Sequence, residues 1–222
     1  ALVGGCNFVA GYPMTPGTSI LEWMAGHGAS HGVVVKHSED EIAALNMVVG
    51  AAHMGARAMT PTSGGGFALM VEALSLAGMT ETPVVIVLAQ RPGPSTGLAT
   101  RTEQADLKFA LSAGHGDFPR IVLAPGSIEQ CFEAGWRAFN LAEQYQTPVI
   151  VLTEHYLATS TRTVDPSAFD LSRVFIDRGQ LLDAEALDEL EVPYARYEVT
   201  HSGVPARALP GHPNACIALT RN

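Results

Sequence analysis

The feature that most constrains the fold is an alternation of short apolar runs with helix-length amphipathic segments. The apolar runs predict strands at 6–12, 32–37, 56–62, 83–89, 120–125 and 147–153, and the amphipathic segments predict helices at 18–27, 39–54, 66–78, 104–112 and 127–145. Helices between apolar, unalternating strands imply βαβ units and a buried parallel sheet. We therefore predict an α/β protein in three layers, with a parallel sheet and helices on both of its faces.

This rhythm stops after residue 163. Residues 164–222 mix prolines with an acidic stretch, "DAEALDELEVP" at 183–193, and have no clear periodicity. We predict a domain at 1–163 and an irregular extension at 164–222, which leads toward a further C-terminal domain outside this sequence. The chain starts without Met and as if inside an element, so we expect it to be a piece of a longer protein.

Charge and cysteine content exclude several classes of protein. The net charge is −9 and no Lys/Arg cluster occurs, so nucleic acid and anionic membranes are poor partner candidates. The longest strongly apolar run, residues 83–89, is too short to span a bilayer. Three cysteines lie far apart without a C-x-x-C pair, which argues against a disulfide framework, a zinc site or a cluster held by this chain alone. We expect reduced thiols in a cytoplasmic protein.

Three consecutive acids open the second predicted helix in "HSEDEIAALN" (37–46). Ser38 and Glu41 have the S-x-x-E spacing of a capping box, in which each side chain accepts from the other residue's backbone N–H. Helix phase adds a second interpretation, because Ala44, Leu45 and Val48 follow Glu41 at i+3, i+4 and i+7. Glu41 therefore lies on the buried face, where a carboxylate needs a donor. The pattern leaves both a helix cap and a functional carboxylate open.

Two loops follow predicted strands directly. In "GYPMTPGTS" (11–19), Pro13 and Pro16 hold the chain extended, and in "TPTSGGGFALM" (60–70) three glycines lead into a helix. Loops at the carboxyl ends of parallel strands are where α/β sheets bind ligands, and a glycine turn lets backbone N–H groups approach an anion or a ring. A rigid strand-to-helix turn is the structural alternative for each.

The segment "QRPGPSTGLATRTEQADL" (90–107) is long for a loop inside a domain, and such loops are usually functional or mobile. Arg91 and Arg101 in it could each bind a carboxylate through two hydrogen bonds. The alternative is that these arginines pair with Glu103 or Asp106 on the surface.

Taken together, these segments resemble the α subunit of the 2-oxoacid:ferredoxin oxidoreductases, in its thiamine-diphosphate pyrimidine-binding domain. The resemblance covers about residues 1–160 and extends to "PRIVLAPGSIEQCFEAGWRAFNLAEQYQTPVIVLTE" and the later "SGVPARALPG". It is closest to the 2-oxoglutarate type. It implies the fold of that domain and a role in the oxidative decarboxylation of a 2-oxoacid to an acyl-CoA, with electrons passed to ferredoxin.

The resemblance also implies roles for individual residues. The family's glutamate that hydrogen-bonds the N1′ atom of the cofactor matches Glu41, as the acid/base group that helps to remove the proton from C2. The threonine and arginine that contact the 2-oxoacid match Thr15 and Arg91, and Arg101 and Thr102 are further candidates. The cofactor-binding set that we expect is Glu41, Pro13, Thr15, Ser63, Gly64 and Gly65. No metal ligand is expected in this chain.

The sequence lacks the diphosphate-binding signature, Gly-Asp-Gly followed by Asn. The resemblance assigns Mg²⁺, the diphosphate site and an iron-sulfur cluster to a partner β subunit. It also implies CoA and ferredoxin as reaction partners, an (αβ)₂ assembly and an inactive isolated chain. Two alternatives remain: the pyrimidine domain of a non-oxidative thiamine enzyme of the decarboxylase or transketolase type, and a non-enzymatic α/β module that retains the fold.

Overall fold

The structure, a computed structural model, describes residues 1–215. Its centre is a six-stranded sheet in which every pair of neighbouring strands is parallel, in the order β2-β1-β3-β4-β6-β5. The strands are β1 (Phe8–Gly11), β2 (Val34–His37), β3 (Ala58–Thr62), β4 (Val85–Gln90), β5 (Ile121–Leu123) and β6 (Val149–Glu154). The sheet confirms the predicted class and all six predicted strands.

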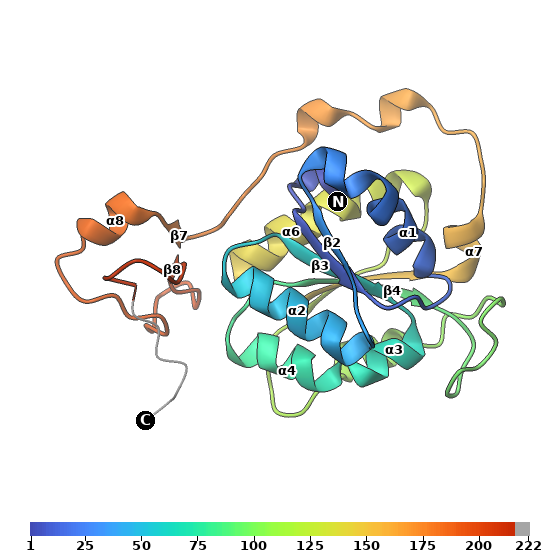
Figure 1. Ribbon diagram of the computed structural model, residues 1–222, viewed down its shortest axis with the longest axis horizontal. Helices are drawn as coiled ribbons and strands as arrows, with labels where there is room; N and C mark the ends of the chain where they lie inside the picture. Colours follow the sequence, from blue (N-terminus) through green and yellow to red (C-terminus); the bar gives the residue numbers. More distant parts are fainter. Residues whose placement is uncertain (216–222) are drawn as a thin grey trace.

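Helices cover both faces of the sheet, so the fold has three layers (Figure 1). One face carries α1 (Thr18–His27) and α6 (Ile128–Tyr145). The opposite face carries α2 (Glu41–His53), α3 (Gly64–Leu69), α4 (Val71–Met79) and α5 (Leu107–Ser112). Short 3-10 turns precede β1 and β2, at Leu2–Gly4 and Gly28–His31, and α7 (His155–Thr159) follows β6.

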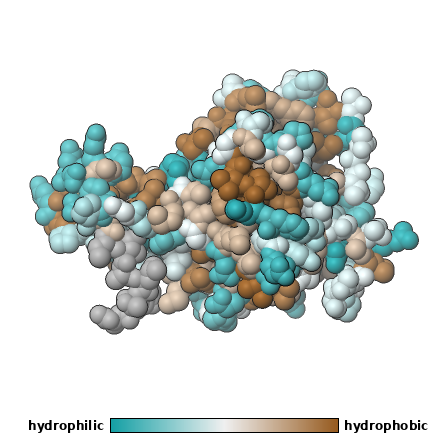
Figure 2. Space-filling model, in the orientation of Figure 1, coloured by the Kyte–Doolittle hydropathy of each residue, from teal (hydrophilic) through white to brown (hydrophobic). Residues whose placement is uncertain are grey.

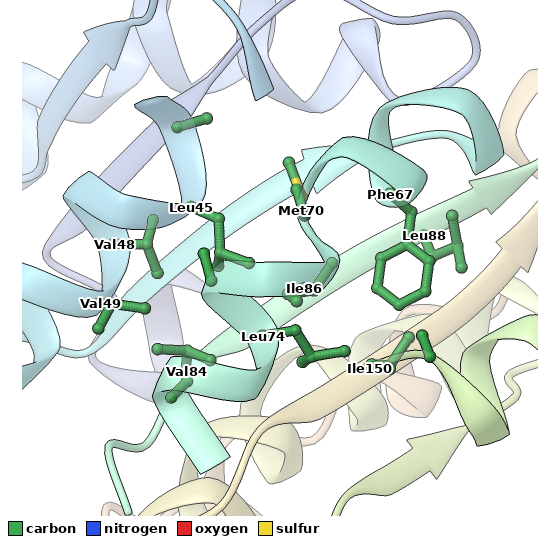
Figure 3. Packing of buried hydrophobic residues seen from close by; sticks show 14 of the residues in the cluster. Leu45, Val48, Val49, Phe67, Met70, Leu74, Val84, Ile86, Leu88 and Ile150 are labelled. Carbon is green, nitrogen blue, oxygen red and sulfur yellow. The ribbon is translucent and has the colours of Figure 1, made fainter. Parts of the chain in front are cut away.

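The larger apolar core lies between the sheet and the α2 face (Figure 3). Leu45 and Val48 of α2, Phe67 of α3, and Ile86 of β4 are wholly buried there. Each fully buried side chain of this kind contributes roughly 1.5–3 kcal/mol relative to an exposed one. A second core, beneath α1 and α6, covers the other face. Burial on both faces explains why the strand sequences do not alternate with polar residues.

One predicted helix is divided in two. The segment 66–78 was expected to form a single helix, but α3 ends at Leu69 and α4 begins at Val71. The N–H of Met70 donates to both Gly66 and Phe67 carbonyls, at 3.2 and 3.0 Å, which tightens this turn. The helix also starts at Gly64, two residues earlier than predicted, so the glycines form its first turn.

The capping box predicted for α2 is wrong. The cap residue is Asp40, whose carboxylate accepts from the Ala43 N–H at 2.7 Å, and the helix begins at Glu41. Ser38 instead directs its hydroxyl to the sulfur of Met47, at 4.0 Å. The extended backbone at Asp40 moves the cap by two residues, so Glu41 does not fold back on the helix end.

The extension returns to the domain before it forms a small lobe (Figure 1). Phe169 and Phe175 pack edge-on against Phe132 and Trp136 of α6, with ring centroids 5.2 and 5.4 Å apart. The lobe contains elements that the sequence did not predict, namely the parallel pair β7 (Leu181–Leu182) and β8 (Arg207–Ala208) and the helix α8 (Ala184–Asp188). The face in Figure 2 is mainly hydrophilic over this lobe, with larger apolar areas over the part that carries the sheet. No helix within residues 1–215 is long and apolar enough to cross a bilayer.

Candidate functional site

The candidate site lies at the carboxyl ends of β1 and β3. These strands are neighbours, but β1 leads to α1 on one face and β3 leads to α3 on the other. Such a point of divergence, a topological switch point, leaves a crevice in which open α/β sheets bind ligands. The amino end of α2, which follows β2, reaches the same edge.

Glu41 is a buried carboxylate at this edge, with 3% of its surface exposed. A methyl group added at Gly66 would lie 2.7 Å from its Oε1 atom, so the side chain rests against the first turn of α3. No group in residues 1–215 donates a hydrogen bond to Oε1, and none of the ion pairs in that range involves Glu41. A buried charge without a partner is costly, so this oxygen is suited to a ligand that brings a donor.

The three glycines that follow Ser63 have different surroundings. A Cβ at Gly64 would meet the carboxylate of Asp106 at 2.7 Å, and one at Gly66 would meet the hydroxyl of Thr62 and the side chain of Glu41. At Gly65 the nearest atom would be the Ser95 carbonyl oxygen at 3.6 Å, so that position is open. Gly64 is therefore required for packing against Asp106, and Gly66 for packing against Thr62 and Glu41, while Gly65 is the glycine that a ligand could approach. Ser63 is fully buried and its hydroxyl has no partner within residues 1–215.

The loop after β1 is hydrogen-bonded both to α3 and to the long loop after β4. The sulfur of Met14 accepts a hydrogen bond from the Gly66 N–H at 3.2 Å, and the carbonyl of Thr15 accepts one from Arg91 Nη1 at 2.7 Å. The peptide bond between Thr15 and Pro16 is cis. Pro13 and the side chain of Thr15 are exposed at the surface beside the crevice. The β1–α1 loop thus connects α3 with the long loop after β4.

Arg91 is buried and holds the long loop through main-chain oxygens. Besides Thr15, it binds the Thr96 carbonyl through Nη2 at 3.0 Å, and its Nε atom has no partner in residues 1–215. It forms no ion pair with Glu103 or Asp106, so the surface pairing considered for it is not present within the described chain. It also lines a cavity between its loop and α3, although its terminal nitrogens are already engaged.

The structure does not bring all the predicted residues together. Arg101 and Thr102 are exposed in the outer part of the loop and do not line the crevice. A cavity of about 580 Å³ lies between that loop and α3. It is lined by Met14, Gly64, Gly65, Ala68, Leu69, Arg91, Pro92, Gly93, Pro94, Ser95, Thr96, Asp106 and Phe109.

Sequence reasoning treated Asp106 only as a partner for arginine. It stands directly before α5, and burial, followed by the charge of Glu103, raises the pKa of its carboxyl group, whereas Arg91 acts in the opposite direction. Its Oδ2 atom is buried and accepts no hydrogen bond from residues 1–215. The sequence signal was an acid at the end of a long loop before an apolar helix.

Two further features concern potential metal ligands and thiols. No group of three or more His, Cys, Asp or Glu side chains in the described chain is arranged to hold a metal ion. Cys6 and Cys131 are free thiols, and Cys216 lies outside the described residues. Burial raises the pKa of the Cys6 thiol to about 11, which keeps it protonated near neutral pH.

The fold and this edge define a class: a three-layer α/β domain with a switch-point ligand site built around a buried, unpaired carboxylate. Residues 1–196 match the family described as pyruvate flavodoxin/ferredoxin oxidoreductase, thiamine diphosphate-binding. The chain belongs to this family.

Named relatives agree with that membership. The chain is 43% identical over 222 residues to the 2-oxoacid:ferredoxin oxidoreductase 1 subunit alpha of Sulfurisphaera tokodaii, covering 95% of this chain and 35% of the relative. It is 51% identical over 152 residues to the 2-oxoglutarate synthase subunit KorA of Methanothermobacter thermautotrophicus, covering 68% of this chain and 40% of that protein.

A solved structure is similar throughout. The 2-oxoglutarate:ferredoxin oxidoreductase from Magnetococcus marinus, with 2-oxoglutarate, coenzyme A and succinyl-CoA bound, superposes with a TM-score of 0.90 at 42% identity. The match covers 99% of this chain and 37% of that one. The chain therefore spans about a third of the length of these longer relatives.

Proposed function

We propose that this chain is the pyrimidine-binding part of the α subunit of a thiamine-diphosphate-dependent 2-oxoacid:ferredoxin oxidoreductase. The observation that carries the proposal is Glu41, whose buried Oε1 atom lacks a donor at the switch point of the sheet. The family match and the names of the relatives support the same activity.

The residues present fit the pyrimidine half of the cofactor. Glu41 offers an unpaired carboxylate oxygen to a ring nitrogen, and Gly65 leaves the first turn of α3 open to a flat ring. We assign Pro13, Thr15, Ser63 and Gly64 to the same cofactor-binding set, Pro13 and Thr15 from the loop after β1, Ser63 and Gly64 from the turn into α3. Thiamine diphosphate, when bound, supplies the nucleophilic carbon that attacks the oxo group of the substrate. Glu41 would share a proton with the ring nitrogen and thus act as an acid/base group.

For the substrate we propose 2-oxoglutarate. The names of the KorA relatives and of the Magnetococcus marinus enzyme support this choice. Arg91 supplies a buried positive charge beside the cavity, next to Thr15. We assign Arg101 and Thr102 to the substrate as well, which requires the exposed loop to fold over the cavity when substrate binds.

The remaining parts of the reaction belong to other chains or other domains. We infer a β subunit that holds the diphosphate, Mg²⁺ and an iron-sulfur cluster, an (αβ)₂ assembly, and CoA and ferredoxin as reaction partners. We also infer that the domain ends near residue 163 and that residues 164–222 lead to a further domain, in a protein of the cytoplasm. The inference of a further domain is supported by the greater length of the relatives, of which this chain covers 35% and 37%.

The test is Glu41→Gln in the full complex with its partner subunit. We expect viologen reduction with 2-oxoglutarate and CoA to fall about 10²–10⁴-fold, because an amide cannot exchange the proton. Glu39→Gln is the matched control, since Glu39 is exposed two residues away, and it should keep full activity.

Unchanged turnover in Glu41→Gln would remove the acid/base role. A complex that releases aldehyde or transfers acyl groups, but never reduces the dye, would favour the non-oxidative thiamine enzymes instead. A complex without any thiamine-dependent reaction would indicate a non-enzymatic module.

A further inference from the structure

The loop after β4 ends at Asp106, whose backbone is held firmly on two sides. Its N–H donates to Oε1 of Gln90, the last residue of β4, at 2.9 Å. Its carbonyl accepts from the Ala110 N–H at 2.8 Å, in the first turn of α5. Segment 91–106 is therefore fixed to the sheet at both of its ends, by β4 and by Asp106.

The side chain of Asp106 is pressed against α3. Both of its oxygens lie where a Cβ of Gly64 would stand, at 2.7 and 2.8 Å, so only glycine permits the contact. Oδ2 is buried and accepts no hydrogen bond within residues 1–215. The carboxyl group thus forms part of the wall of the cavity between the loop and α3, which Arg91 also lines.

Few charged groups act on this carboxyl group. Glu103 and Arg91, both from its own loop, exert opposite effects. The turn of α3 presents Gly64 and Gly65, and the β1–α1 loop presents Met14, none of which ionises. Burial is the largest influence and favours the neutral form.

We propose that Asp106 is a positioning residue whose contact with Gly64 holds segment 91–106 against α3 and so sets the width of the cavity beside Arg91. This inference rests on the proposed function, because the cavity is where we place the 2-oxoacid. Since no group within residues 1–215 donates to the buried Oδ2 atom, deprotonation weakens the contact and the loop moves outward.

The experiment is a double-mutant cycle in the full complex, read as KM for 2-oxoglutarate and as kcat. Asp106→Ala removes the carboxyl group from the cavity wall and is expected to raise KM about tenfold with kcat nearly unchanged. Gly64→Ala places a methyl group on the carboxylate and should raise KM similarly. The double variant should recover most of the loss, because the methyl group then fills the space that the carboxylate left. Asp117→Ala, at an exposed site in another loop, is the control.

Additive losses in the double variant would overturn the proposal, since they would mean that Gly64 is needed for another reason, such as cofactor approach. Asp106→Asn supplies the second readout. It keeps the shape without the charge, so its KM should stay near that of the native complex and should not rise with pH, whereas the native KM should rise as pH passes the raised pKa of Asp106. An identical pH dependence in Asp106→Asn would contradict the proposal.

Amide hydrogen exchange separates this inference from the proposed function. If Asp106 holds the loop, exchange in segment 91–106 increases in Asp106→Ala and returns toward native in the double variant, whether or not the complex oxidises a 2-oxoacid. Unchanged exchange would overturn the positioning role even in an active enzyme.

Discussion

Two glutamates at opposite ends of the sheet are equally buried but differ in the charged partners that surround them. Glu41 and Glu143 are each 3% exposed, the first at the carboxyl end and the second near the C-terminus of α6. Glu143 accepts hydrogen bonds from Arg178 Nε at 2.7 Å and Arg207 Nη2 at 3.0 Å, and Arg57 Nε lies 3.4 Å from it. No comparable cation serves Glu41 in the described chain.

The difference shows how one residue type serves structure at one site and chemistry at another. Three arginines compensate Glu143 and thereby attach the extension to the domain, since Arg178 and Arg207 belong to the extension and Arg57 precedes β3. No group in residues 1–215 donates to Oε1 of Glu41. The rest of the fold therefore offsets the free-energy cost of desolvating this side chain, and the oxygen stays available.

The largest effect expected from this comparison is a loss of folding stability when Glu143 is replaced. Glu143→Ala removes the carboxylate to which Arg178 and Arg207 donate and with which Arg57 pairs, at a largely buried site, so the free energy of unfolding should fall by about 3–5 kcal/mol. Thermal or urea unfolding of the full complex measures it. The matched control is Glu133→Ala, which breaks the exposed pair with Arg137 and should cost at most about 1 kcal/mol. A similar small loss in both variants would show that the arginines are satisfied elsewhere.

A smaller difference in stability is expected between substitutions at Gly65 and Gly66, the last two glycines of the turn. Gly66→Ala forces a methyl group onto both Thr62 Oγ1 and Glu41 and should cost about 1–3 kcal/mol, with weaker thiamine diphosphate binding measured by titration. Gly65→Ala has room for its methyl group, so the fold should tolerate it. Equal destabilisation by both substitutions would mean that the crowding around Glu41 is not what requires glycine.

The smallest effect is expected for the stability of Glu41→Gln without cofactor. An amide costs less to bury than an unpaired carboxylate, so the variant should be as stable as the native complex or more stable, by up to about 1 kcal/mol. Added thiamine diphosphate should raise the melting temperature less in the variant than in the native protein. A clear loss of stability would indicate that Glu41 has a structural partner, as Glu143 does.

Local patterns predicted most of the fold. Apolar runs such as residues 83–89 and 147–153 correspond to the neighbouring central strands β4 and β6, because burial on both faces imposes an apolar sequence. Helix phase correctly predicted that Glu41 is buried. The S-x-x-E spacing pointed to the wrong cap, since Ser38 and Asp40 are both good cap residues and only the backbone path after β2 decides between them.

The site was only partly predictable. The loops that carry Thr15, Arg91 and Gly65 follow strands, so the edge of the sheet could be inferred. The contact between Asp106 and Gly64 joins positions that are distant in the chain, and nothing local marks it. The docking of the extension through Glu143 was missed for the same reason, because its partners Arg178 and Arg207 lie in a segment without periodicity.

The sequence by itself determined the parallel α/β class, the order of the helices and strands, and the buried position of Glu41, because these depend on periodicities within a few residues. Only the tertiary structure decided which acid remains unpaired. That property depends on whether chain segments far apart in sequence bring a donor, as Arg57, Arg178 and Arg207 do for Glu143, or only a glycine, as α3 does for Glu41.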